Sequence, residues 1–310
     1  MKFATWNVNS VRQRQTHVLE WLAQVQPDLL MLQEIKCEED QFPGDVFREA
    51  GYHSAVVGQK SYNGVAILSR QPFEVRCRSL PGLTEAEPPA RYIEVESCGI
   101  VFGNLYLPNG NSGGAAGYEG KLEFLAALTA HARRMLVEEK DFVLAGDYNV
   151  CPTERDLAPG ALPADDALVR PESRAAFREL LWLGLTDAVR ALHPDETIYT
   201  FWDYQAGAWR RDMGLRIDHA LLSPRLAERL ISAEPDRDER GKEKPSDHVP
   251  LIVTLSWTSC QPMKRSIRVI CAVATDRESH ASARSRVTGP TPACGLLGKS
   301  RHRKQATGRK

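Results

Sequence analysis

The sequence predicts an α/β (α+β) protein built from stacked β-sheets with helices outside. Up to Leu255, short apolar runs alternate with turn residues, and only a few segments have helical spacing. Many strands with few helices are typical of sheets that pack on each other and are flanked by helices. Several of the runs are continuously apolar rather than alternating, which indicates strands that are covered on both faces.

The expected strands are short apolar segments bounded by residues that favour turns, such as Gly, Pro, Asn and Asp. Taken in chain order, they are residues 3–8, 28–32, 64–69, 91–96, 100–107, 142–145, 216–222 and 249–255. We find no internal repeat among them.

Helices are expected where apolar residues recur every three or four positions, at residues 16–25, 121–138 and 173–183. In the second, one face carries Leu122, Leu125, Leu128 and Ala132. Ser173 is a candidate N-cap of the third. Residues 108–120 and 203–215 are expected to form long loops that contain glycine, and such loops are often functional.

The composition is that of an ordinary globular protein, with 42% hydrophobic and 26% charged residues. No run of about 18 apolar residues occurs, so we expect no membrane span. The first ten residues, MKFATWNVNS, lack the apolar core of a signal peptide, so we expect a cytoplasmic protein. The seven cysteines form no Cys-x-x-Cys pair, which argues against a zinc ribbon or a disulfide framework.

The charge distribution divides the chain near Leu255. Residues 256–310 contain 12 Lys and Arg but 2 Asp and Glu, so of the 40 residues of each sign, residues 1–255 keep 28 and 38. We therefore expect a folded domain at 1–255 and a basic, disordered tail at 256–310. The tail is either a cationic arm that raises non-specific DNA affinity or sequence without a function, such as out-of-frame translation.

Polar residues stand where the expected strands begin or end. The stretch DFVLAGDYNV, residues 141–150, places Asp147 and Asn149 directly after a buried run. The same pattern recurs at Asn7 and Asn9, Glu34, Tyr106 and Asn109, Asp218, and Asp247 and His248. Each has an ordinary structural interpretation as a cap, a turn residue or a core tyrosine. Asp218 is the hardest to explain in that way, because a carboxylate inside an apolar strand needs a partner.

If Glu34, Asp147, Asp218 and Asp247 converge, their charges require compensation. Two carboxylates about 4 Å apart repel by roughly 4 kcal/mol at an effective dielectric constant of about 20. Oxygen ligands suit Mg²⁺ or Mn²⁺, whereas a single histidine suits proton chemistry better than a zinc site. The pattern therefore indicates metal-assisted hydrolysis of a phosphate ester.

Seven segments in order resemble the exonuclease III family of apurinic/apyrimidinic (AP) endonucleases, within the endonuclease/exonuclease/phosphatase superfamily. They are TWNVNSVR, LQEIK, YNGVAILS, NLYLPNG, GDYNVCPTERD, GLRIDHALLS and SDHVPL. The likeness covers residues 1–255 and is strongest to the bacterial exonuclease III branch. It implies a four-layer αββα sandwich, in which two mixed β-sheets pack face to face with helices outside.

The resemblance also implies roles for individual residues. Glu34 is similar to the principal Mg²⁺ ligand, and Mn²⁺ is expected to substitute for Mg²⁺. The same metal and phosphate site is implied for Asn7, Asp147, Asn149, Asp247 and His248. Asp147 is similar to the residue that activates the attacking water or protonates the leaving group. His248 would lie beside the scissile phosphate, oriented by Asp218, and a neighbouring carboxylate favours its protonated form. Asn149 would stabilise the transition state, and Tyr106 would bind the phosphate.

The resemblance further implies contacts with DNA. The family's pocket for a flipped-out abasic sugar is matched by Phe201, Trp202, Leu215 and Ile217, although Phe201 and Ile217 also fit a plain hydrophobic core. Among the basic residues that flank the motifs, we expect phosphate contacts first from Arg91, Lys121 and Arg216. The loop 108–120 contains no arginine, whereas some AP endonucleases insert an arginine into DNA from this region.

The expected activity is that of a Mg²⁺-dependent AP endonuclease that cuts 5′ to abasic sites and has 3′–5′ exonuclease and 3′-phosphodiesterase activity. Its partner would be double-stranded DNA with abasic sites or blocked 3′ ends, and we expect a monomer. Two alternatives stay open at this point. One is a superfamily phosphatase that acts on inositol phosphates or sphingomyelin, and the other is a DNA-binding module with a degenerate site.

Overall fold

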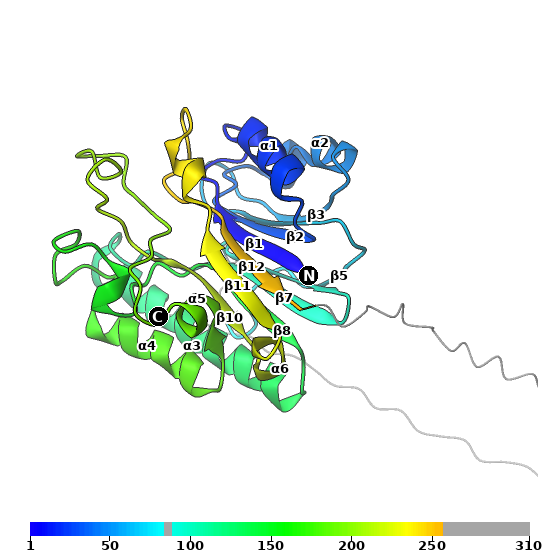
Figure 1. The fold of residues 1–310 in the computed structure, drawn as a ribbon. Coiled ribbons are helices and arrows are strands. Elements are labelled where there is room, and N and C mark those ends of the chain that lie inside the picture. The colour runs from blue at the N-terminus through cyan, green and yellow to red at the C-terminus, as the bar shows by residue number, and fades with distance from the viewer. Residues whose placement is uncertain (84–88, 257–310) are drawn as a thin grey trace, which may run out of the picture. The chain divides into compact units, whose positions relative to one another are not determined.

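Two mixed six-stranded sheets form the centre of the protein in the computed structural model, which describes residues 1–83 and 89–256 (Figure 1). The first sheet has the order β11 (Leu230–Pro235), β12 (Leu251–Leu255), β1 (Lys2–Asn7), β2 (Leu29–Gln33), β4 (Val65–Ser69) and β3 (His53–Val57). The second has the order β5 (Glu74–Cys77), β6 (Tyr92–Ser97), β7 (Ile100–Tyr106), β8 (Phe142–Asp147), β10 (Asp218–Leu222) and β9 (Thr186–Asp187). The pairs β1–β2 and β7–β8 are parallel and the other pairs are antiparallel.

The inner faces of the two sheets pack on each other and form the main core. Phe3 and Met31 of the first sheet belong to the same buried cluster as Phe102 and Val143 of the second. The rings of Phe3 and Phe102 meet edge to face with 5.7 Å between their centroids. Because successive residues of a strand point to opposite faces, the next residues of β1 and β8, Ala4 and Leu144, face outward.

Helices cover both outer faces of the sandwich. On the first sheet, α1 (Gln15–Val25) and α2 (Gly44–Glu49) bury Trp21 and Phe47 in the cluster that contains Ala4. On the second sheet, α3 (Gly114–Val137) and α4 (Pro171–Trp182) bury Phe124 and Phe177 in the cluster that contains Leu144. Short helices α5 (Ala188–Leu192) and α6 (Pro224–Ala227) follow β9 and β10. The predicted four-layer αββα sandwich is confirmed.

The sequence predicted every interior strand and missed the edges. All eight expected strands are present, with ends that differ by one or two residues. The four strands that were not predicted are β3, β5, β9 and β11, and each is the outermost strand of its sheet. Edge strands are partly exposed, as the alternating exposure of β5 illustrates, so they lack the continuous apolar runs that mark a buried strand.

Two predictions about helices are corrected. The helix expected from residue 121 begins at Gly114, so the loop after β7 ends at Gly113. The helix α4 begins at Pro171 rather than at Ser173, and proline suits a first helical position because that position needs no amide donor. Ser173 is buried inside the first turn, where its Oγ donates a hydrogen bond to the carbonyl of Ala167.

Beyond Ser256, the tail predicted from its charge lies outside the described residues. None of the helices in the described part of the chain has the length and apolar character that crossing a membrane requires.

Candidate active site

The polar residues predicted at strand ends meet at one edge of the two sheets. Because β1 and β2 are parallel, Asn7 and Glu34 emerge from their carboxyl ends together. In the second sheet, Asp147 at the end of β8 pairs in register with Asp218 at the start of antiparallel β10. Asp247 and His248 come from the segment that precedes β12. The sandwich therefore brings five separate segments to one site.

Gly146 allows β8 to deliver Asp147 to this edge. A Cβ atom at position 146 would lie 1.9 Å from the carbonyl oxygen of Leu105 on the neighbouring strand β7, and the φ angle of Gly146 is +153°. Glycine is needed where two backbones approach this closely. After Asp147 the chain turns, because the Asn149 amide donates to Asp147 Oδ1 at 2.9 Å and Asn149 takes a φ angle of +48°. The segment is thus both a turn and part of the site.

Asn7 links the two carboxylates at the centre of the cluster. Its Nδ2 donates to Glu34 Oε1 at 2.8 Å and to Asp147 Oδ2 at 3.0 Å. Glu34, Asp147 and His248 each offer one ligand atom, and these atoms all lie within 4.8 Å of one another. Two carboxylates beside amide groups form an oxygen-rich set that fits a hard divalent cation such as Mg²⁺ or Mn²⁺.

Asp247 does not belong to this group of three ligand atoms, but hydrogen bonds connect it to Glu34 through Asn9 and Lys36. Its Oδ1 accepts a hydrogen bond from Asn9 Nδ2 at 3.1 Å. Asn9 Oδ1 accepts one from Lys36, whose Nζ is 2.9 Å from Glu34 Oε2. Asn9 was noted at a strand end but was given no role in the site, and Lys36 was not among the predicted metal or catalytic residues. The signal for Asn9 was in the sequence, because Asn7 and Asn9 have the same spacing as Asp147 and Asn149 and form the same turn, with the Asn9 amide donating to Asn7 Oδ1.

His248 is buried between two carboxylates. Its Nδ1 lies 2.8 Å from Asp218 Oδ2, and its Nε2 lies 3.8 Å from Asp147 Oδ2. Burial alone would lower the pKa of His248, but the charges of Asp218 and Asp147 outweigh it and raise the pKa to about 10. Burial also raises the pKa of Asp147, although the charge of His248 opposes this. The site therefore holds an imidazolium next to a carboxyl group that binds a proton unusually well.

Tyr106 and Asn149 are the remaining residues that were predicted to act on the phosphate. Burial, together with the charges of Glu34 and Asp147, raises the pKa of Tyr106 far above its usual value, so its hydroxyl stays protonated. The guanidinium of Arg91 lies 4.5 Å from the centre of the Tyr106 ring. The side chain of Asn149 is fixed by two hydrogen bonds: its Nδ2 donates to the Leu107 carbonyl, and its Oδ1 accepts from Asn109.

The structure does not place Arg216 or Lys121 at a surface where either side chain can touch DNA. Arg216 is fully buried, and its guanidinium pairs with Asp156 at 2.7 Å and Asp187 at 2.8 Å. Lys121 is also buried, and its Nζ donates to the carbonyls of Asn109 and Asn149. Burial lowers the pKa of Lys121 to about 8. Neither side chain can therefore reach a DNA phosphate. Of the three expected DNA contacts, Arg91 is the one that is partly exposed.

A cavity of about 310 Å³ lies on the Phe201 side of the site, and His248 itself does not line it. Phe201 and Leu215 line it, and the Phe201 ring lies 4.9 Å from the His248 ring. Trp202 and Ile217 are buried in the hydrophobic clusters behind the cavity and do not line it. Of the four expected pocket residues, Phe201 and Leu215 are therefore in position to touch a ligand.

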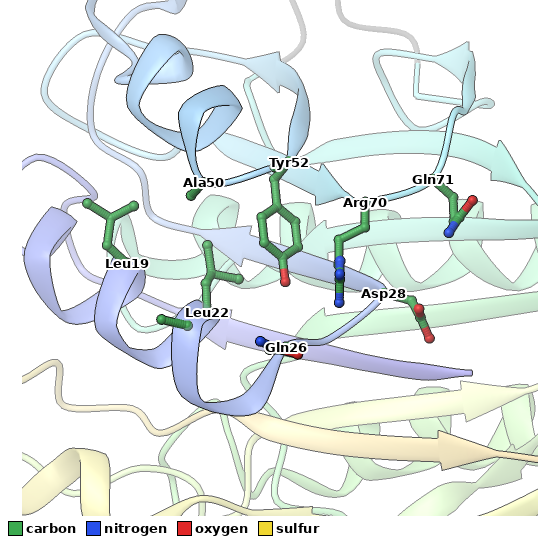
Figure 2. A pocket seen from close by; sticks show the side chains of 10 residues that line it. Leu19, Leu22, Gln26, Asp28, Ala50, Tyr52, Arg70 and Gln71 are labelled. Carbon is green, nitrogen blue, oxygen red and sulfur yellow. The ribbon is translucent and has the colours of Figure 1, made fainter.

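A larger cavity of about 620 Å³ lies at the opposite end of the first sheet (Figure 2). Asp28 and Arg70 line it, one directly before β2 and the other directly after antiparallel β4. Figure 2 shows Tyr52 and Arg70 pointing toward Gln26 at the end of α1. Glu34 follows the other end of β2, so this cavity is separate from the cluster of Glu34, Asp147 and His248.

Comparison with known proteins gives consistent results. Residues 4–248 match the endonuclease/exonuclease/phosphatase family. Exodeoxyribonuclease III of Haemophilus influenzae is 33% identical over 264 residues, which cover 81% of this chain and 98% of that protein. An AP endonuclease from Archaeoglobus fulgidus superposes with a TM-score of 0.78 at 36% identity, covering 83% of this chain and all of that one. The 3′ phosphatase NExo from Neisseria, bound to a product DNA hairpin, superposes with a TM-score of 0.79 at 37% identity and the same coverage.

Proposed function

Because the chain belongs to the exonuclease III and AP endonuclease branch of the endonuclease/exonuclease/phosphatase family, we propose that it is a Mg²⁺-dependent DNA-repair nuclease. It cuts DNA on the 5′ side of abasic sites and also acts at 3′ ends as a 3′–5′ exonuclease and 3′-phosphodiesterase. The observation that carries the proposal is the convergence of Glu34, Asp147 and His248 within 4.8 Å. We take the working form to be a cytoplasmic monomer on double-stranded DNA.

Glu34 and Asp147 are the residues that would hold the metal, with Asn7 fixing both carboxylates. Asp247 and Asn149 would add polar groups around the metal. Asn9 donates a hydrogen bond to Asp247, and the backbone amide of Asn149 donates one to Asp147. A bound Mg²⁺ supplies positive charge that stabilises the negative charge gathering on the phosphate oxygens. Burial alone would raise the pKa of Glu34, but the hydrogen bond from Asn7 and the contact with Lys36 lower it, so Glu34 stays ionised.

His248 and Asp147 divide the proton chemistry. The imidazolium of His248 donates a hydrogen bond from Nε2 to a phosphate oxygen, while Asp218 holds the ring by Nδ1. Asp147, whose pKa is raised by burial, moves a proton at Oδ2. It either takes the proton from the attacking water or gives one to the leaving O3′ oxygen as the phosphorus–oxygen bond breaks. The products are a 3′-hydroxyl and a 5′-phosphate.

Neutral donors stabilise the transition state. The Tyr106 hydroxyl stays protonated and would donate a hydrogen bond to a phosphate oxygen. Asn149 has one amide hydrogen engaged with the Leu107 carbonyl, which leaves the second hydrogen for the phosphate. Donors that are fixed before the substrate binds need no reorganisation during the reaction, so they lower the barrier most effectively.

The cavity on the Phe201 side of the site supports an abasic site as the substrate. Its walls include apolar side chains such as Phe201 and Leu215 and polar ones such as Asp203 and Arg211. The apolar part of the cavity would accept a deoxyribose without its base, and lifting such a nucleotide out of the helix breaks no base pair. Arg91, next to the ring of Tyr106, is the proposed contact to a neighbouring phosphate.

The test is incision of a duplex that carries one abasic-site analogue, measured with Mg²⁺ and with EDTA and mapped on a sequencing gel. The proposal predicts a cut immediately 5′ to the analogue that requires Mg²⁺ or Mn²⁺ and leaves a 3′-hydroxyl. Hydrolysis of inositol phosphates without incision would keep the chemistry and change the substrate. No hydrolysis of any phosphate ester, together with DNA binding, would contradict an enzymatic function.

A further inference from the structure

The cavity on the Phe201 side of the site depends on one exposed segment, which we call the pocket loop, residues 203–213. Six of the residues that line the cavity come from it: Asp203, Gln205, Ala206, Ala208, Arg211 and Met213. Most of the loop is exposed, and Ala206, Gly207 and Asp212 have φ angles between +52° and +63°. A loop with so little burial and such a backbone does not keep one shape by itself. Something else must hold this wall of the cavity in place.

Arg237 holds one end of the pocket loop. It belongs to a short 3₁₀ helix, η3 (Arg237–Gly241), that lies outside the catalytic cluster. Its guanidinium lies 4.8 Å from the ring centre of Trp202 and 5.4 Å from that of Trp209. Its NH2 donates to Asp212 Oδ1 at 2.9 Å, and the same oxygen accepts a hydrogen bond from Trp202 Nε1. Asp212 therefore closes the loop onto both Trp202 and Arg237.

Arg240, from the same 3₁₀ helix, holds the other end of the loop. Its guanidinium donates to the carbonyls of Trp202 and Asp203 and lies 5.2 Å from the ring centre of Tyr204. The Tyr204 hydroxyl donates to the Pro245 carbonyl and accepts from Arg14. Pro245 is followed within three residues by Asp247 and His248. Residues of η3 thus hold both ends of the pocket loop. At one end, Tyr204 also joins the loop to the segment that carries Asp247 and His248.

We propose that Arg237 and Arg240 are positioning residues, which set substrate selectivity by holding the pocket loop as a preformed wall of the sugar cavity. This inference rests on the proposed function. A wall that is fixed before binding favours a substrate that fits the cavity, because no free energy is spent on ordering the loop. A loosened wall weakens binding of an abasic site, yet it leaves the metal, proton and phosphate groups where they are.

Two substitutions separate this role from a simple attraction between Arg237 and DNA. Arg237→Ala removes a positive charge and Asp212→Asn removes a negative charge, so their electrostatic effects on DNA affinity are opposite. Both substitutions break the same ion pair, so both should loosen the pocket loop. Arg237 has a side-chain exposure of 45% and Asp212 of 55%, so neither substitution should prevent folding. Arg225→Ala is the matched control, since it removes another partly exposed arginine that pairs with an aspartate, Asp141, far along the chain.

The first readout is selectivity, defined as kcat/KM for incision at an abasic analogue divided by kcat/KM for removal of a 3′-phosphate. We expect Arg237→Ala and Asp212→Asn each to lower this ratio by about three- to tenfold through a higher KM for the abasic duplex. Arg237→Lys keeps the charge but stacks poorly on tryptophan, so it should restore the ratio only in part. Arg225→Ala should leave the ratio unchanged.

The second readout does not need activity. Arg210 and Arg211 are exposed in the pocket loop and form a trypsin site. Cleavage there, located by mass spectrometry, should be faster in Arg237→Ala and Asp212→Asn than in the wild type or in Arg225→Ala. If the wild type incises abasic DNA, the inference would be overturned by an unchanged selectivity ratio in the two variants. Opposite effects of the two substitutions on that ratio would also overturn it. If the wild type does not incise at all, the proposed function fails, and the trypsin experiment alone decides whether the two residues hold the loop.

Discussion

Asp218 and His248 form a buried hydrogen bond, with 2.8 Å between the carboxylate Oδ2 and the ring Nδ1. The pair joins β10 of one sheet to the segment before β12 of the other. Asp218 is the partner that keeps His248 charged, because burial alone would favour the neutral ring. The same contact explains why a carboxylate stands at the start of an otherwise apolar strand.

Replacing Asp218 with Asn should weaken the reaction most at alkaline pH. Without the carboxylate, the pKa of His248 falls from about 10, so the imidazolium is lost at a lower pH. We expect kcat at neutral pH to fall by about 10²- to 10³-fold. In a profile of kcat against pH, the alkaline limb should move to lower pH, and an unchanged limb would show that His248 does not act as a cation.

Gly146→Ala should destabilise the protein and displace the catalytic turn. The added methyl group would lie 1.9 Å from the carbonyl oxygen of Leu105, so β7 and β8 must move apart. We expect the free energy of unfolding to fall by about 2–3 kcal/mol, and activity to fall as Asp147 shifts. Urea unfolding measures the first effect. Gly120→Ala, at a helical position with open space around the new Cβ, is the control and should not reduce stability.

Arg216→Met should reduce stability rather than DNA binding. The change leaves Asp156 and Asp187 buried without their cation, which typically costs about 3–5 kcal/mol. The control Arg133→Met removes an exposed arginine of α3 and should be nearly neutral. Because Arg216 does not reach the surface, the salt dependence of DNA binding should stay the same in folded Arg216→Met. A flatter salt dependence would mean that Arg216 contacts a phosphate after all.

His219 should make the protein sensitive to mild acid. Burial, reinforced by the charge of Arg216, lowers the pKa of His219 from 6.5 to about 4. Between these values the unfolded chain binds the proton and the folded chain does not, so stability falls as the pH falls from 6.5 to 4. A difference of this size corresponds to about 3 kcal/mol.

His219→Gln tests this dependence, because its amide can still donate to the Val150 carbonyl that lies 2.9 Å from Nε2 in the wild type. The free energy of unfolding of His219→Gln should change less between pH 6.5 and 4 than that of the wild type. Parallel curves for the two proteins would show that His219 is not the source of the acid sensitivity.

The sequence contained most of the information about the catalytic cluster. Glu34, Asp147 and His248 each adjoin a strand that is marked by its apolar run, and the resemblance supplied the packing of two mixed sheets between layers of helices. Hydrophobic patterns identify strands that are covered on both faces, which is why the edge strands β3, β5, β9 and β11 were missed. The early start of α3 was missed for a related reason, since Gly114 and Gly117 are typical of loops.

The charged residues around the site were harder to place. A motif shows that Arg216 stands near Asp218, but it does not show on which side of the strand the guanidinium lies. Only the fold brings Asp156 and Asp187 to it from two distant segments. Alternation along an extended segment accounts for Trp202, because Phe201 takes the position that faces the cavity and the next residue points the other way. Ile217 packs with Leu215 in the same hydrophobic cluster but does not line the cavity.

The central claim is that the strand-end cluster hydrolyses a phosphodiester through Asp147. The most direct measurement is the single-turnover rate of incision at an abasic analogue by Asp147→Asn and by the wild type, at DNA and Mg²⁺ concentrations where both proteins are fully bound. The account predicts that the substitution lowers the rate by about 10³-fold while DNA affinity is retained. A rate within about tenfold of the wild type would contradict it, because proton transfer by a carboxyl group contributes at least that much.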